Sequence, residues 1–179
     1  YYVSGVLYDQ KGIVIGSDYK RYSVTSNLDT NATDKLKIGS NLFARRASRN
    51  GILSQEESGG TNNSGVISSA FKFAPTLGIY DDEGNYTLNP IGDPSDNPVA
   101  VARERKNEEV TDRLQANFYG EYQIIEDLTF RVTLGGSIEN RREGTYTPTT
   151  LNAGRSVNGD GSIESNKNTD MINENYLTY

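Results

Sequence analysis

The sequence predicts an all-β fold of antiparallel strands that form part of a large transmembrane β-barrel, with short turns at one end and long loops with a short helix at the other. Three observations predict it. Apolar and polar residues alternate with a period of two, short polar turns join the alternating segments in pairs, and long connections rich in Gly, Asn, Ser and Asp separate the pairs. Mean hydropathy is -0.66, which suits a barrel wall because only alternate residues face lipid. No run approaches the ~20 apolar residues of a membrane-spanning helix.

The first predicted hairpin pairs residues 18–29 with residues 34–46. Apolar side chains take alternate positions in both segments, and the polar residues 30–33 between them form a short turn. The apolar face of this hairpin carries Tyr22, Val24, Leu28, Leu36, Ile38 and Leu42.

The second predicted hairpin pairs residues 110–124 with residues 128–142 across a brief turn at Glu126 and Asp127. Its apolar face carries Leu114, Phe118, Ile124, Phe130, Val132 and Leu134. We expect the short turns of both hairpins to lie at the same end of the sheet. Residues 1–8 and 176–179 are expected to be flanking strands.

Three longer connections separate these strands: residues 9–17, about 48–109 and about 143–173. In the second of them, apolar residues at helical spacing predict a short helix near Val66–Phe73 that ends before Pro75. Residues 80–86 then form a turn between two extended pieces. Long loops with internal structure are usually functional, so we expect an ordered extracellular excursion here.

Charged and amide side chains occupy the face opposite the apolar residues. We expect the apolar face to meet lipid and the polar face to line the lumen, because an Arg or Lys facing hydrocarbon near the midplane costs roughly 2–4 kcal/mol. The lumen-facing candidates are Arg21, Asn27, Asn41, Arg113, Asn117, Glu121 and Arg131.

A soluble β-sandwich is the alternative explanation of the alternation, because its apolar face would pack against a second sheet. That reading makes the chain a carbohydrate-binding surface module without transport activity, and a structural adhesin is a weaker third reading. Charged residues such as Arg113 and Arg131 near strand centres, and long loops gathered at one end, favour the barrel.

Composition and charge exclude several classes of function. The net charge of -6 argues against nucleic acid as a partner, because phosphate binding needs clustered Lys and Arg. The sequence has no Cys and no His, so it lacks a disulfide framework, a thiolate nucleophile and the commonest metal ligand and general base. We therefore expect no catalytic residue, no cofactor and no enzymatic activity.

One segment, Asn158–Ser162, begins like a calcium loop. The twelfth position from Asn158 is Thr169, where a bidentate Glu is required, and the sixth position lacks Gly. A glycine-rich turn is the better interpretation, so no metal site is predicted.

Aromatic and acidic residues in the long loop are candidates for ligand contact. Tyr80 and Tyr86 could stack on sugar rings, and Asp81 and Asp82 could accept hydrogen bonds from sugar hydroxyls or hold a cation. The competing interpretation treats the tyrosines as loop anchors and the acidic residues as a solvated turn.

Small basic groups stand near the predicted strand ends: Arg45, Arg46, Arg49, Arg103, Arg105 and Lys106. Most are expected to be solvated. Contact with anionic headgroups of the outer leaflet is the second interpretation.

An ordered series of segments resembles the SusC/RagA family of TonB-dependent outer-membrane transporters. These are residues 12–22 running into 27–29, residues 37–42, residues 65–70 through 74–76, residues 80–86, residues 97–100, and the hairpin from 117–122 to 128–135. The series follows the order of the family over nearly the whole chain.

The resemblance implies a barrel of about 22 strands that is plugged by an N-terminal domain. It also implies location in the outer membrane of a Gram-negative cell, a SusD-like surface lipoprotein as partner, and a glycan or peptide substrate imported with energy from the TonB complex. The chain opens and ends in strand-like alternation. We therefore expect residues 1–179 to be a partial barrel region without the plug and the TonB-contacting segment.

Overall fold

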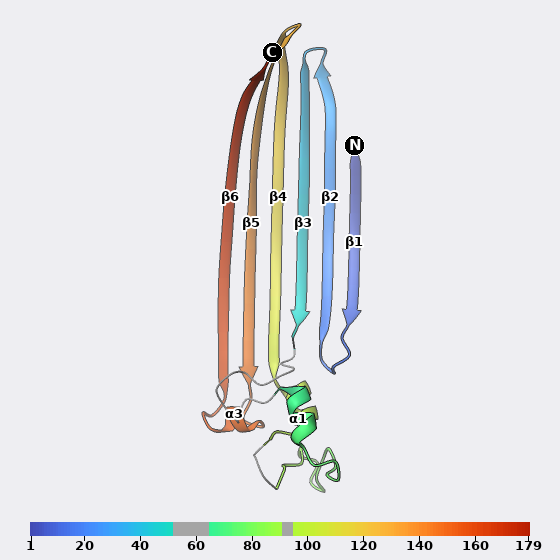
Figure 1. Ribbon diagram of the computed structural model, residues 1–179, viewed down its shortest axis with the longest axis vertical. Coiled ribbons are helices and arrows are strands. Elements are labelled where there is room, and N and C mark those ends of the chain that lie inside the picture. The colour runs from blue at the N-terminus through green and yellow to red at the C-terminus, as the bar shows by residue number, and fades with distance from the viewer. Residues whose placement is uncertain (52–64, 91–94) are drawn as a thin grey trace.

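The computed structural model describes residues 1–51, 65–90 and 95–179, and it confirms the all-β class. Six strands form one antiparallel sheet in which each strand pairs with the next along the chain (Figure 1). The strands are β1 (Tyr2–Lys11), β2 (Asp18–Thr33), β3 (Leu36–Asn50), β4 (Lys106–Ile125), β5 (Leu128–Thr147) and β6 (Asp160–Thr178). Three short helices, α1 (Val66–Lys72), α2 (Pro98–Glu104) and α3 (Asn152–Arg155), lie in the connections.

Both predicted hairpins are confirmed, and both strands of each are longer than expected. β2 pairs with β3, and β4 pairs with β5, over nearly their whole lengths. The two tight turns lie at the same end of the sheet (Figure 1). The first turn is later than predicted, because residues 30–33 continue β2 and Thr33 Oγ1 accepts hydrogen bonds from the backbone N–H groups of Lys35 and Leu36 at 3.3 and 3.1 Å.

The prediction of a loop over residues 143–173 is wrong. β5 continues to Thr147, and β6 begins at Asp160 and pairs with β5 along its whole length, from Asp160 opposite Thr147 to Thr178 opposite Thr129. The loop-end part of β6 is polar on both faces, so hydrophobic alternation gave no signal there. Pairing of backbone N–H and C=O groups with β5 needs no such alternation. The first connection is likewise shorter than predicted, since β1 extends to Lys11.

Register places the apolar side chains on one face of the sheet. Residues directly opposite each other in an antiparallel pair share a face, and the pairing aligns Val24 with Ala44, Ala44 with Leu114, and Leu114 with Ile138. We call this the apolar face and the opposite one the polar face. The outward candidates on regular strand positions share the apolar face, and Ile124 lies in a bulge between Gln123 and Ile125.

Neither face is covered by a second sheet among the described residues, because the six strands form a single layer. Leu114 and Phe118 are each 53% exposed and Leu134 is 52% exposed, although all three stand in mid-strand. A β-sandwich would bury these side chains against a second sheet. The sandwich alternative therefore has no structural counterpart in the part of the chain that is described.

The apolar side chains form a band shorter than the strands that carry it. On β4 the band runs from Leu114 to Tyr122, about 27 Å at roughly 3.4 Å per residue. The 20 residues of β4 extend about 68 Å at the same rise. Toward the loop end, the next position on this face is Asp112, aligned with Arg46 and Asn140. The continuous apolar band ends there. The strands continue beyond it with mainly polar side chains on this face, among which Val110, Tyr146 and Ile163 are scattered apolar ones.

The helices pack with the loops into a small cluster at the loop end. Its core is Ala100, Val101 and Leu151, with Val66 and Tyr86 packed against it. Helix α1 confirms the helix expected near Val66–Phe73. Of the excursion predicted over residues 48–109, residues 52–64 and 91–94 lie outside the described residues, and its first and last residues belong to β3 and β4.

Helix α2 was not predicted, although its start carries a clear signal. Asn97 is the N-cap, and its Oδ1 accepts a hydrogen bond from Val99 N at 3.0 Å, while Pro98 occupies the first helical position. The Asn97 side chain also donates to Ile79 O at 2.9 Å, which ties α2 to the preceding loop.

In the described residues, no helix combines the length and apolarity needed to cross a membrane.

Packing of α1 on α2 gives a testable prediction. Val66→Ala in the complete protein should destabilise the loop cluster by about 1–2 kcal/mol, because Val66 packs against the buried core of the cluster. Amide hydrogen exchange at Ser69 and Phe73, whose N–H groups donate within α1 at 2.8 Å, should rise accordingly. Ile67→Ala is the control, because Ile67 is exposed and should leave exchange unchanged. Exchange at unstructured rates in the unmodified protein would contradict an ordered α1.

Candidate functional site

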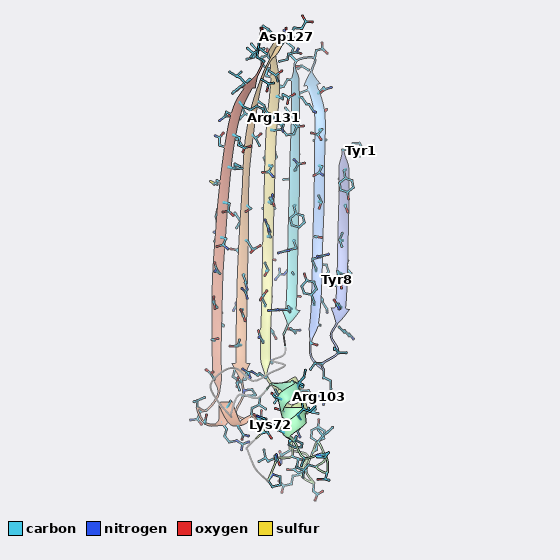
Figure 2. The ribbon with its side chains drawn as sticks, in the orientation of Figure 1. Tyr1, Tyr8, Lys72, Arg103, Asp127 and Arg131 are labelled. Atoms are coloured by element: carbon cyan, nitrogen blue, oxygen red, sulfur yellow. The ribbon has the colours of Figure 1, made fainter. Side chains whose placement is uncertain are left out.

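The polar face of the sheet brings the predicted lumen candidates together. Arg21, Asn27, Asn41, Arg113, Asn117, Glu121 and Arg131 all occupy positions of this face in the observed register. In Figure 2, Arg131 lies near the turn end, and Tyr8, which is opposite Arg21 in the register, lies closer to the loop end. The three asparagines of this set form a neutral row, and the charged members belong to clusters on either side of it.

The neutral row consists of three amides in one line across the sheet. Asn27 is opposite Asn41, and Asn41 is opposite Asn117, so three neighbouring strands present asparagines at the same height. Gly135 continues the line on β5, and its missing side chain leaves space for Asn117, whose Oδ1 would lie 2.0 Å from a Cβ at that position. The row offers donors and acceptors without net charge.

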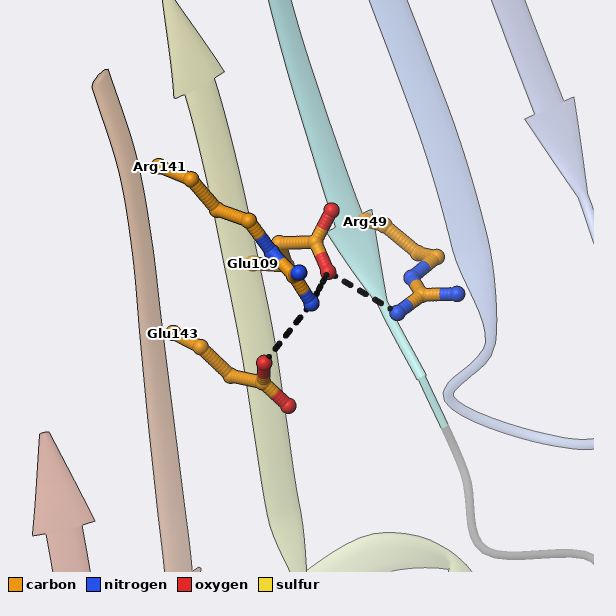
Figure 3. Close-up of polar contacts among 4 residues, drawn as sticks. All are labelled: Arg49, Glu109, Arg141 and Glu143. Atoms are coloured by element: carbon orange, nitrogen blue, oxygen red, sulfur yellow. Dashed lines mark hydrogen bonds and ion pairs between the residues drawn. The ribbon is translucent and has the colours of Figure 1, made fainter. Parts of the chain in front are cut away.

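The strongest charged cluster lies near the loop end and centres on Glu109 (Figure 3). Its Oε2 accepts hydrogen bonds from Arg49 Nη2 at 3.0 Å and from Arg141 Nη2 at 2.8 Å. Arg141 also donates to Glu143 at 2.9 Å. Glu109 is the most enclosed of these side chains, at 20% exposure, so a single carboxylate joins β3 to β5 across β4.

A second cluster lies two positions along the same face closer to the centre of the sheet. Arg45 and Arg113 are directly opposite each other, which would be repulsive if they were alone. Glu139 lies 3.7 Å from the first and 3.8 Å from the second, and its charge offsets that repulsion. Within the described residues, the Nε atoms of both arginines lack a hydrogen-bond partner. These two Nε atoms are buried within the cluster, so the ion pairs with Glu139 leave part of the hydrogen-bonding capacity of both guanidinium groups unsatisfied.

The third cluster lies near the turn end, around Tyr119. The Arg131 guanidinium lies 4.1 Å from the centroid of the Tyr119 ring and 3.4 Å from Glu121 Oε2. The Tyr119 hydroxyl donates to Asp29. The ring covers Gly39, where a Cβ would lie 2.2 Å from ring atom Cε1, so only glycine admits this ring position. Cation–π stacking and the ion pair together fix the Arg131 side chain.

Arg21 stacks at the N-terminal side of the same face. Its guanidinium lies 5.7 Å from the centroid of the Tyr8 ring, which meets Tyr19 edge to face at 6.0 Å. Like Arg45 and Arg113, Arg21 has an Nε without a partner in the described part of the chain.

The loop candidates Tyr80 and Tyr86 lie side by side but have different roles in the loop. Their rings are 5.2 Å apart, and the two residues form an isolated antiparallel bridge. Tyr86 packs on the core of the loop cluster and donates to Glu104 at 3.1 Å. Partial burial, together with the Glu104 carboxylate, raises the pKa of Tyr86. Tyr86 is therefore an anchor of the loop. Tyr80 is 46% exposed and accepts a hydrogen bond from Arg103 at 3.0 Å, so one of its faces remains open to a ligand.

The acidic candidates Asp81 and Asp82 also differ in role. Asp81 Oδ1 accepts hydrogen bonds from the backbone N–H groups of Glu83 and Asn85 at 3.0 and 2.8 Å, so it builds the turn. Asp82 is exposed at the tip of that turn. No group of three or more acidic residues among the described residues could hold a metal ion.

The calcium-like segment takes the conformation of a turn followed by a strand. Asn158 and Gly159 have φ of 60° and 94°, and residues from Asp160 onward belong to β6. An extended strand directs alternate side chains to opposite faces, so it cannot wrap around one ion.

The alternation places Tyr119 and Glu139 on the polar side of the second hairpin, but the lumen-facing candidates did not include them. Glu109 and Arg141 were missed altogether, although parity could have found them, because Glu109 stands on the same alternate positions of β4 as Arg113, and Arg141 on those of β5 as Arg131. Their partners depend on the register between strands, which the alternation alone leaves open.

Comparisons with known proteins agree with this architecture. The chain is 44% identical over 179 residues to TonB-dependent receptor P3 of Formosa agariphila and covers 18% of its length. It is 27% identical over 186 residues to TonB-dependent receptor P26 of the same organism and covers 17% of it. The chain thus spans about a fifth of the length of these curated relatives. No protein-family model matches the sequence.

Among solved structures, the fold matches the RagAB peptide importer in its closed-closed state with a TM-score of 0.72 and 21% sequence identity. The match covers 98% of this chain and 20% of the importer chain. A second RagAB peptide transporter structure matches with a TM-score of 0.61 and 20% identity. These matches show a shared fold and confirm the fold class. Together with the similarity to TonB-dependent receptor P3, they confirm the resemblance found in the sequence.

Glu109 provides the first prediction from this surface. Glu109→Gln in the complete protein should speed amide exchange at the loop ends of β3 to β5, with a loss of about 1 kcal/mol, because Arg49 and Arg141 both lose their charged acceptor. Glu143→Gln removes only one ion pair and is the matched control. Equal effects of the two substitutions would show that Glu109 does not join the strands.

Asp96 makes the docking of the two loops dependent on pH. Its Oδ1 accepts a hydrogen bond from Asn152 N at 2.9 Å, which connects the loop before α2 to α3. Burial raises the pKa of Asp96 above its ordinary value near 3.8, and Asn152, Arg155 and Arg105 oppose the rise. The docked loop therefore binds the proton more tightly than the undocked loop.

This contribution to docking is fully present below about pH 3.8 and is lost as the pH rises through the raised pKa. We expect the protection of the Asn152 amide, corrected for intrinsic exchange, to fall over that window. Asp96→Asn keeps an acceptor and removes the titration, so its protection should not change with pH. A wild-type profile as flat as that of Asp96→Asn would contradict the assignment.

Proposed function

We propose that this region of a SusC/RagA-type TonB-dependent receptor forms part of the wall of an outer-membrane barrel that imports nutrients. The observation that carries the proposal is the division of one uncovered sheet into an apolar band and a charged face. In water the exposed apolar side chains would be costly, at roughly 1.5–3 kcal/mol for each large one. In a bilayer, lipid covers them.

The height of the band supports this placement. About 27 Å along β4, inclined by about 40° as barrel strands are, gives close to the ~25 Å apolar height of outer-membrane barrels once side chains are included. Tyr122 and Phe130, paired at the turn end of the band, correspond to an aromatic girdle. The short turns would then be periplasmic and the loop cluster extracellular.

The polar face is then the surface that lines the lumen or contacts the plug. Its alternating arginines, carboxylates and amides suit a polar cargo, and both glycans and oligopeptides fit that description. The RagAB proteins are named as a peptide importer, which supports peptides as the cargo class. Import would draw its energy from the TonB complex and would involve a SusD-like surface lipoprotein, both as the family resemblance implies.

Residues 1–179 contribute to this function as one barrel-wall region of a Gram-negative outer-membrane protein, and no catalytic step is assigned to them. Tyr80 and Asp82 are the loop residues best placed to meet cargo, since both are exposed. Tyr86 and Asp81 would support the loop that carries them.

The proposal predicts opposite results for adjacent positions. Leu134→Arg in the complete transporter should impair assembly in the outer membrane, because it places a charge near the middle of the apolar band at a cost of about 2–4 kcal/mol. Thr133→Arg adds the same charge on the polar face and should assemble normally. Surface immunoblots measure assembly, and uptake of fluorescent oligopeptide and oligosaccharide pools measures transport.

Spin labels at Val132 and Arg131 separate the membrane placement from a general folding defect. In the reconstituted transporter, the label at Val132 should respond to a lipid-soluble quencher and the label at Arg131 to a water-soluble one. Access of the water-soluble quencher alone at both positions would overturn the barrel placement. If the transporter assembled normally, but its deletion reduced neither oligopeptide uptake nor oligosaccharide uptake, the transport function would be overturned.

A further inference from the structure

We propose that the outward surface of β3 to β6 holds one phosphorylated glycolipid of the outer leaflet, with its phosphate among Arg46, Arg142 and Lys167 and an acyl chain in the groove beside them. This inference rests on the proposed function, because the apolar face must meet lipid. The three cations stand immediately beyond the loop end of the apolar band, where the phosphates of an outer leaflet would lie.

The phosphate site is a cavity of about 460 Å³ lined by these three side chains together with Asp112, Asn140 and Ser165. Register explains the gathering: Arg46, Asp112, Asn140 and Lys167 lie opposite one another on successive strands, and Arg142 is the next residue of β5 on that face. Four strands therefore supply one cluster.

The charges of this cavity do not cancel. Arg46 lies 3.6 Å from Asp112, and both side chains are well exposed. Arg142 and Lys167 form no ion pair with any residue that the structure describes.

Arg141 also borders the cavity, but its guanidinium bonds Glu109 and Glu143 on the opposite face. The side chains on the cavity's own face thus comprise three cations against one carboxylate. A phosphate group would supply the missing negative charge and accept the arginine's paired N–H donors.

The same height of the sheet is neutral on β1 and β2. There Lys20 is opposite Asp9, and Lys11 is opposite Asp18, so each lysine faces a carboxylate across the strands. The excess positive charge is confined to the β3 to β6 side, which argues for a local site in place of a uniform basic belt.

A groove of about 480 Å³ lies next to the phosphate site on the same face. Its floor is formed by Ala116 and Gly136, which are directly opposite each other, and its walls include Leu114, Phe118, Leu134 and Met171. Small residues flanked by large ones make a trough along the strands. An acyl chain fits it because the exposed lining is almost entirely apolar.

The two cavities adjoin each other along the strands. Asp112 and Leu114, Asn140 and Ile138, and Lys167 and Thr169 are successive residues of one face, and in each pair the first lines the phosphate site and the second the groove. Each step is about 6.8 Å along the strand. That spacing suits a lipid whose phosphate and acyl chain join through a sugar or glycerol unit.

The experiment uses the full-length transporter in phosphatidylethanolamine nanodiscs that contain either bisphosphorylated or phosphate-free lipid A. Native mass spectrometry counts the lipid A molecules retained by the protein. We expect one retained molecule in the bisphosphorylated discs. Arg142→Gln combined with Lys167→Gln should weaken its retention about tenfold or more, because two charge-assisted contacts are lost. Ala116→Phe, which fills the groove, should also weaken it.

Lys20→Gln is the matched control, since Lys20 lies on the same face and at the same height as Arg142. It should retain lipid A as the wild type does, and phosphate-free discs should show no difference between variants. Equal retention by the wild type and the double variant would overturn the proposal, as would an equal loss in Lys20→Gln. So would a co-purifying protein, in place of lipid, whose binding depends on the same two residues.

The label at Val132 distinguishes failure of this inference from failure of the proposed function. If the label at Val132 responds to the lipid-soluble quencher but lipid A retention does not depend on Arg142 and Lys167, the barrel placement stands and the lipid site is wrong. If Val132 responds only to the water-soluble quencher, the proposed function and the lipid site fail together.

Discussion

Unbroken antiparallel pairing is the constraint on which every other feature of this chain depends. Among the described strands, the register shifts only between Asn31 and Thr33 and between Gln123 and Ile125, both beside the tight turns. Because side chains alternate with a period of two, a slip of one residue in mid-strand would exchange the two faces. Because both irregularities lie beside the tight turns, they do not exchange the two faces in mid-strand. The apolar band and the charged clusters therefore each stay on one face of the six-stranded sheet.

Magnitudes assign different roles to the backbone and to the charges. Exposed ion pairs each contribute roughly 0–1 kcal/mol, and most pairs on the polar face are at least partly exposed. These pairs are too weak to hold the sheet together, whereas the ladder of backbone hydrogen bonds is continuous. What the pairs do is fix the directions of Arg45, Arg113 and Arg131. The side chains of the polar face are therefore ordered by their ion pairs, while the stability of the sheet comes from its backbone hydrogen bonds.

The sequence predicted the parts of the fold in which hydrophobicity changes from one residue to the next. Both hairpins, the common end of their turns, the first helix and the segregation of Asn27, Asn41 and Asn117 from Leu42 and Phe118 followed from alternation and turn residues. The end of β6 was expected as a flanking strand, but residues 160–175 were not, because their first eleven positions carry a single large apolar side chain, Ile163, and so show no hydrophobic period. The sequence left open whether Tyr80 and Tyr86 contact a ligand or anchor the loop, and only packing on Ala100 and Val101 shows that Tyr86 is an anchor.

The connection from Gly51 to Arg105 divides the sheet between β3 and β4, and we call this junction the seam. Strands β2 and β3 are joined by two residues, and so are β4 and β5, whereas β3 and β4 meet across an excursion of about 55 residues. Closing a flexible loop of that length costs about 3 kcal/mol more entropy than closing a two-residue turn. Because each hairpin closes through a two-residue turn, we expect the two hairpins to pair first and the seam between them to pair later. The loop cluster shortens the effective length of the excursion, and its prior folding would lower this kinetic barrier.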